Sequence, residues 1–169
     1  MKLLLIVLLA ASVSAFSGPV EFGGHAGIFL PAGDDLDLFN TSLIFGVDAL
    51  IHMPMFAIEG SISYAPLSTD DLLGTTEYSA SMIPVLAGLR TYAGPIFYGG
   101  GLAYHTVSVS FVDALGVKHD NTDSEFGGYG NIGMVLPVGG MDVEASLKYH
   151  LVDFDFDSAW LGLTAGINF

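Results

Sequence analysis

Residues 141–151 decide the fold class, because they alternate strictly between apolar and other side chains in the sequence MDVEASLKYHL. The apolar positions are Met141, Val143, Ala145, Leu147, Tyr149 and Leu151, and the positions between them are Asp142, Glu144, Ser146, Lys148 and His150. Successive side chains of a β-strand point to opposite faces of the sheet. This segment therefore predicts a strand with one apolar and one polar face.

The same alternation recurs along the chain, and no stretch has convincing helical periodicity. It predicts eight strands at residues 20–30, 42–53, 56–64, 79–92, 96–110, 126–136, 141–151 and 159–169. Their lengths centre on the roughly 9 to 11 residues that a strand needs to cross a bilayer. An even number of strands closes on itself without leaving an edge. We therefore expect an all-β fold, a closed eight-stranded antiparallel up-and-down transmembrane β-barrel. Pro84 removes a ladder donor inside the fourth strand, where we expect a β-bulge.

The connections between the predicted strands alternate in length. Long polar segments at residues 31–41, 65–78, 111–125 and 153–158 take turns with tight turns at Pro54, at Gly94-Pro95, and at Pro137 with Gly139-Gly140. Antiparallel strands joined in this order place every long loop at one end of the barrel. In outer-membrane barrels that end is extracellular.

The apolar positions need an apolar environment, and the polar positions supply too little apolar surface to form a core. With the apolar positions facing lipid, two outward aromatic rings result, as is typical of membrane interfaces. One ring comprises Phe22, Phe56, Tyr98 and Phe169 near the short turns, and the other comprises Tyr64, Tyr104, Phe126 and Tyr149 near the long loops.

The amino-terminal end has the pattern of a secretory signal. A basic Lys2 precedes an apolar run too short to span a bilayer, and Val13 and Ala15 suit a cleavage site. We expect a signal peptide at residues 1–15 and a barrel domain at residues 16–169. The absence of cysteine excludes a lipoprotein anchor and disulfides. With 18 acidic and 4 basic residues, the chain is also unsuited to nucleic acid.

The pattern resembles the small outer-membrane barrels of the OmpA transmembrane-domain and OmpX type, across the whole mature chain. The most specific element is the last strand, which resembles the signal read by the barrel-assembly machinery and has Leu161, Leu163, Ala165, Ile167 and Phe169 at every second position. The resemblance implies a location in the bacterial outer membrane and contact with its lipid and lipopolysaccharide. It also implies transient binding to the barrel-assembly machinery. We expect a monomer without a cofactor.

Charged residues at inward positions form the first candidate site. Glu59 and Arg90 lie on neighbouring predicted strands, with Glu144 and Lys148 across the lumen, and the resemblance implies a salt-bridge cluster of this kind. Such a network either satisfies itself structurally or lines a narrow, gated water or ion path. Histidines on inward positions form no spacing that identifies a catalytic triad or a metal site, so we expect no catalytic residues.

The second candidate site is the loop that contains Asp153, Asp155 and Asp157. Carboxylates at a spacing of two share one face of an extended segment, and oxygen ligands suit Ca²⁺ or Mg²⁺. The segment matches no EF-hand, so a solvated acidic rim is the alternative to a cation-binding loop.

These features predict a non-enzymatic outer-membrane barrel with a structural and surface-interaction role, acidic extracellular loops and a charged lumen filled by side chains. One alternative is a small pore or a conduit for hydrophobic solutes. A lipid-modifying outer-membrane enzyme and a secreted soluble barrel are further alternatives.

Overall fold

The computed structural model describes residues 20–36, 39–69, 77–112 and 116–169. The predicted signal peptide, residues 1–15, lies outside the described residues. Within those ranges no helix has the length and apolar character needed to cross a bilayer.

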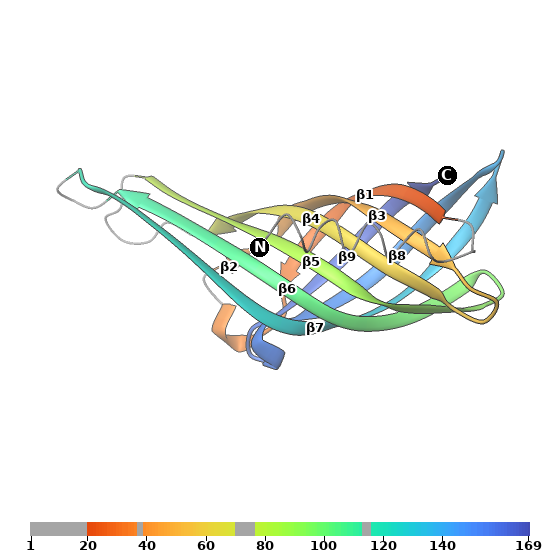
Figure 1. Ribbon diagram of the computed structural model, residues 1–169. Helices are drawn as coiled ribbons and strands as arrows, with labels where there is room; N and C mark the ends of the chain where they lie inside the picture. The colour runs from red at the N-terminus through yellow and green to blue at the C-terminus, as the bar shows by residue number, and fades with distance from the viewer. Residues whose placement is uncertain (1–19, 37–38, 70–76, 113–115) are drawn as a thin grey trace, which may run out of the picture.

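Eight long antiparallel strands close into a barrel (Figure 1). They are β1 (Val20–Pro31), β3 (Ser42–His52), β4 (Ala57–Thr69), β5 (Glu77–Ala93), β6 (Ile96–Val112), β7 (Lys118–Val138), β8 (Met141–Leu151) and β9 (Ala159–Asn168). Each pairs with its neighbour in sequence, and β9 pairs with β1 to close the ring. The two-residue β2 (Phe39–Asn40) extends the sheet beside β4, and two 3-10 turns, η1 (Asp34–Leu36) and η2 (Val152–Phe154), lie in loops. The predicted closed eight-stranded barrel is confirmed.

Tight turns join the strands at one end of the barrel. Gly139 and Gly140 connect β7 to β8 with φ angles of 61° and 90°. Two successive positive φ values are what a two-residue hairpin needs to match the twist of its strands, and glycine adopts them without steric cost. Pro137, predicted to be part of this turn, instead pairs with Asp142 inside the β7–β8 ladder.

The apolar side chains that alternate along each strand face outward, as the sequence predicts. Along β8, the side chains of Val143 and Leu147 are exposed while those of Glu144 and Lys148 are buried. The eight residues of the two predicted aromatic rings all lie on outward positions. At the loop end, the ring centroids of Tyr104 and Phe126 are 4.9 Å apart on neighbouring strands. The outer wall is therefore apolar and banded by aromatic side chains, like a surface that faces lipid.

The β6–β7 hairpin is longer than its alternation predicts. In the segment predicted as a long loop, residues 111–125, the described residues 111–112 and 118–125 continue the two strands, and β6 and β7 pair up to Val112 and Lys118. Hydroxyl pairs cross this part of the ladder, with 3.1 Å between the oxygens of Thr106 and Ser124. The loop prediction was wrong because residues 118–125 of β7 are polar on both faces of the strand and so show no alternation. Figure 1 shows β6 and β7 projecting at this end together with the start of β5, which pairs with β6 up to Glu77 and Val112.

Pro84 does not cause a β-bulge. Strands β4 and β5 pair at Ile62 with Val85 and again at Ala65 with Met82, so the register is the same on both sides and no residue is inserted. Pro84 still pairs with His105 of β6. Proline has no backbone N–H to donate, and the β4–β5 ladder is interrupted over two positions at this point. The predicted β-bulge is therefore wrong.

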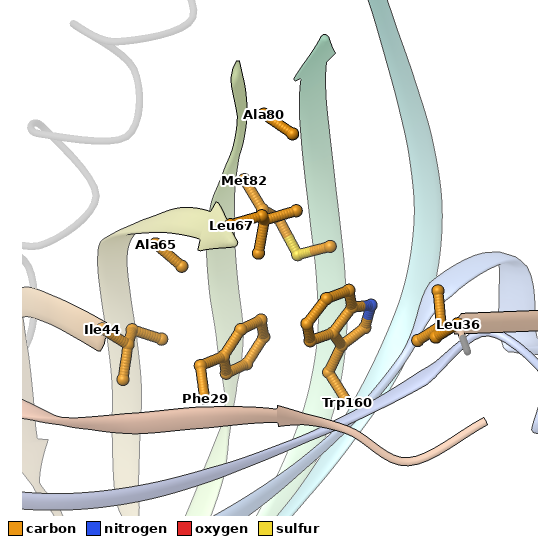
Figure 2. Packing of buried hydrophobic residues seen from close by; sticks show 8 residues of the cluster. All are labelled: Phe29, Leu36, Ile44, Ala65, Leu67, Ala80, Met82 and Trp160. Carbon is orange, nitrogen blue, oxygen red and sulfur yellow. The ribbon is translucent and has the colours of Figure 1, made fainter. Parts of the chain in front are cut away.

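An apolar cluster, here called the plug, fills the loop end of the lumen (Figure 2). Its buried members are Phe29, Leu36, Ile44, Ala65, Leu67, Ala80, Met82 and Trp160. The rings of Phe29 and Trp160 stack with centroids 4.9 Å apart. The interior is therefore divided, with polar groups deeper in the barrel and a small hydrophobic core beneath the loops.

We expect Phe29→Ala to lower the free energy of unfolding by about 3–5 kcal/mol, because it leaves a cavity where the side chain is 0 % exposed. Leu163→Ala is the matched control, since Leu163 is 50 % exposed on the outer wall, where lipid or detergent fills the lost volume. The measurement is urea unfolding of the refolded protein, followed by the gel mobility of unboiled samples. Equal losses in both variants would contradict a packed plug.

Candidate functional site

The side chains in the lumen form three layers, and β3 contributes one inward residue to each of them. His52 lies at the short-turn end, with its Nε2 3.0 Å from a carboxylate oxygen of Glu21. Asp48 lies at mid-height, among the other buried charges. Ile44 belongs to the plug at the loop end. Because a strand rises about 3.3 Å per residue, these three residues are roughly 13 Å apart along the strand.

Arg90 is the centre of the charge network. It is 1 % exposed, and its guanidinium donates to Glu59, with 2.9 Å between Nη2 and Oε1. A second carboxylate, from Glu144 across the lumen, accepts from Nη1. The cation also lies over the ring of Phe97, 3.9 Å from its centroid. Two carboxylates and an aromatic face thus replace the water that the guanidinium leaves when it is buried.

Lys148 joins this cluster from β8. Its Nζ lies 3.4 Å from Glu59 Oε1 and 3.3 Å from Asp48 Oδ1. Asp48 also contacts His25 Nδ1. The structure therefore brings Glu59, Arg90, Glu144 and Lys148 together in one continuous network.

The network also includes residues beyond the four candidate ones. Asn131 donates to Glu59 Oε2 at 2.8 Å, Asn168 donates to Glu144 Oε2 at 3.3 Å, and Asp48 accepts from Lys148. Asn131, Asn168 and Asp48 all occupy inward positions, so the alternation along each strand could have indicated that their side chains enter the lumen. Parity shows which side chains enter the lumen, but it does not show which strands face each other across it.

His25 links Asp48 to Ser63, with 3.0 Å between its Nε2 and the Ser63 hydroxyl. This order, Asp–His–Ser, has the connectivity of a hydrolase triad. The Ser63 hydroxyl, however, is buried inside the lumen, and Asp48 is also paired with Lys148. The arrangement thus holds side chains in place and offers no nucleophile to a substrate outside the barrel.

The candidate cation loop has a different geometry from the expected one. The segment is not extended, because η2 turns the chain and Asp153 has a φ of 51°. The Asp157 N–H donates to Asp155 Oδ1 at 3.1 Å, which uses one carboxylate to fix the turn. The three carboxylates therefore do not share one face. Among the described residues, no three His, Cys, Asp or Glu side chains are placed to hold a metal ion.

We expect Arg90→Met to lower the free energy of unfolding by about 3–5 kcal/mol, because it leaves Glu144 buried without its cation and leaves Glu59 with Lys148 as its single cationic partner among the described residues. The triple variant Glu59→Gln, Arg90→Met, Glu144→Gln removes all three charges and should recover most of the loss. Urea unfolding of the three proteins measures both effects. A triple variant as unstable as Arg90→Met would show that packing, not charge, accounts for the effect.

No protein-family model and no curated protein matches the sequence. Solved structures do match the fold. The crystal structure of Neisserial surface protein A, NspA, has a TM-score of 0.56 and 13% sequence identity over 88% of this chain and 95% of that one. The attachment invasion locus protein Ail of Yersinia pestis has a TM-score of 0.56 and 13% identity, over 89% of this chain and 96% of that one.

A second structure of Ail, in complex with the heparin analogue sucrose octasulfate, has a TM-score of 0.54 and 15% identity over the same shares of both chains. At these identities the likeness concerns the fold. Both neighbours are small barrels of eight strands from bacterial outer membranes. Their match extends over most of this chain. The chain has the fold of the small eight-stranded outer-membrane β-barrels.

Proposed function

We propose that this protein resides in the bacterial outer membrane as a non-enzymatic, non-conducting barrel that supports the envelope and presents an acidic surface for contact outside the cell. The β6–β7 hairpin carries this proposal. It continues past the aromatic ring formed in part by Tyr104 and Phe126, and it holds exposed acids where the outer wall has become polar.

The exposed acids of the hairpin are Asp120, Asp123 and Glu125. A hydrogen bond with the Ser110 hydroxyl, together with the neighbouring Lys118 ammonium 3.1 Å away, lowers the pKa of the Asp120 carboxyl. This carboxyl therefore stays ionised at physiological pH. More exposed acids at the same end, Asp34, Asp153, Asp155 and Asp157, extend the negative surface.

The hairpin also offers a strand edge. In the described part of the chain, residues 120–126 of β7 pair with β6 on one side and with no strand on the other, because the ladder with β8 starts at Gly128. An unpaired edge can take up an extended peptide through main-chain hydrogen bonds. With its acidic side chains, this edge favours a basic extended segment of a partner. Lipopolysaccharide bridged by divalent cations is a second partner that we propose for the acidic rim.

The lumen supports a structural role over a pore or solute conduit. The Arg90 network fills mid-height, and the stacked rings of Phe29 and Trp160 belong to a plug above it. An eight-stranded barrel has an interior just wide enough for side chains. Water and ions would have to displace both layers to pass.

We expect the refolded protein to give no conductance above the baseline of a planar bilayer in concentrated KCl, because two layers of side chains fill the lumen. A large porin inserted in the same bilayers is the positive control. Discrete, reproducible openings would favour the pore alternative.

We expect neutralising the hairpin acids, by Asp120→Asn, Asp123→Asn and Glu125→Gln together, to weaken binding of a basic extended peptide about tenfold, since each exposed charge pair contributes up to about 1 kcal/mol. Asp142→Asn, at the short-turn end, is the matched control and should not change binding. The measurement is fluorescence anisotropy of a labelled oligolysine peptide with protein in nanodiscs, repeated at higher salt. Equal binding by all proteins would exclude the acidic hairpin as the contact surface.

A further inference from the structure

The segment at residues 152–157 turns back along the outside of the barrel. Asp153 and Phe154 are the non-glycine residues with positive φ in the described ranges, at 51° and 55°. This conformation is rare for a bulky residue such as phenylalanine. It carries the ring of Phe154 over Gly128, where an added Cβ would lie 3.2 Å from the ring. Since Gly128 pairs with Leu102 and Leu151 on outward positions, the ring lies on the outer wall.

The height of these rings on the wall follows from the ladder. Gly128 is two residues further into the barrel than Phe126, which pairs with Tyr104 in the loop-end aromatic ring. The ring of Phe156 lies 6.5 Å from that of Tyr149, another member of the same aromatic ring. Both loop phenylalanines are thus level with residues that mark the membrane interface.

The wall beneath Phe154 is a shallow groove of about 580 Å³. Gly128 and Gly130 supply no side chains there, and Ile132, Leu147 and Tyr149 form its sides. Even so, Phe154 is 57 % exposed and Phe156 is 68 % exposed. Two large apolar rings therefore stay largely uncovered by the protein, although the backbone at Phe154 adopts a strained conformation to place its ring.

We propose that residues 152–157 anchor the loop end in the outer leaflet, with Phe154 and Phe156 inserted among lipid chains and Asp153, Asp155 and Asp157 held at the level of the headgroups. This inference rests on the proposed outer-membrane location. The occupant is lipid because the two rings continue the lipid-facing surface of β7 and β8 without a break. The alternating sequence Asp-Phe-Asp-Phe-Asp is thus explained by a boundary between water and lipid, and the motif needs no bound cation.

The chain contains no cysteine, so single cysteines can carry a nitroxide label without background. The experiment places the label at Phe154→Cys and at Phe156→Cys in protein refolded into phosphatidylcholine vesicles. Electron paramagnetic resonance then compares collisions with oxygen, which concentrates in lipid, and with a water-soluble nickel chelate. Leu163→Cys on the outer wall and Asn121→Cys on the hairpin are the controls for lipid and for water.

We expect the ratio of oxygen to nickel accessibility at both loop positions to lie within about twofold of the Leu163→Cys value and several-fold above the Asn121→Cys value. Ratios like that of Asn121→Cys, with Leu163→Cys reporting lipid, would overturn the anchor and leave the membrane location intact. If the label at Leu163→Cys also gave the ratio of a water-exposed site, the proposed membrane location itself would be overturned. Dipolar broadening from a nearby label would assign the rings to a second copy of the chain and would also overturn the proposal.

Discussion

Closure of the sheet is the constraint on which the rest of this structure depends. An outer wall that carries Val143, Leu147 and Leu163 toward lipid has no water with which its backbone can bond. Each N–H and C=O must therefore find a partner within the sheet, and the pairing of β9 with β1 removes the last two edges. Phe169 completes the seam by exchanging two backbone hydrogen bonds with Phe22, at 3.0 and 3.1 Å.

Closure at eight strands also dictates how the lumen is filled. The interior is too narrow to hold bulk water, so each inward side chain must be matched by another one. Charged groups meet this requirement at mid-height, where Arg90 lies between Glu59 and Glu144. Near the loops, the same requirement is met by dispersion contacts between Phe29 and Trp160. Both solutions fill the lumen with side chains, and this filling supports the proposed role on the outer surface.

The boundary between lipid and water explains the loop end. Below it, outward positions are apolar and aromatic, as at Tyr104 and Phe126. Above it, the same strands carry hydroxyls and acids, such as Ser108, Thr122 and Asp120. The hairpin continues because backbone hydrogen bonds still pair its two strands, while its side chains no longer need to avoid water. At the base of the hairpin, beside Gly128 of β7, Phe154 and Phe156 bring apolar surface back to the boundary from a loop.

The sequence by itself determined which residues form the membrane-crossing strands and which way each side chain points. Strand parity is local: it follows from the alternation along one strand, so β8 is predicted with its observed bounds and Glu59, Arg90, Glu144 and Lys148 are predicted to point inward. Only the tertiary structure decided which of these charges meet, that Phe29 and Trp160 form a plug, that β4 and β5 tolerate Pro84 without a bulge, and that residues 118–125 continue a strand. These features depend on the stagger of strands around a closed ring and on contacts across the lumen. Arg90 and Glu144, for example, are 54 positions apart in the sequence and become neighbours only when the ring closes.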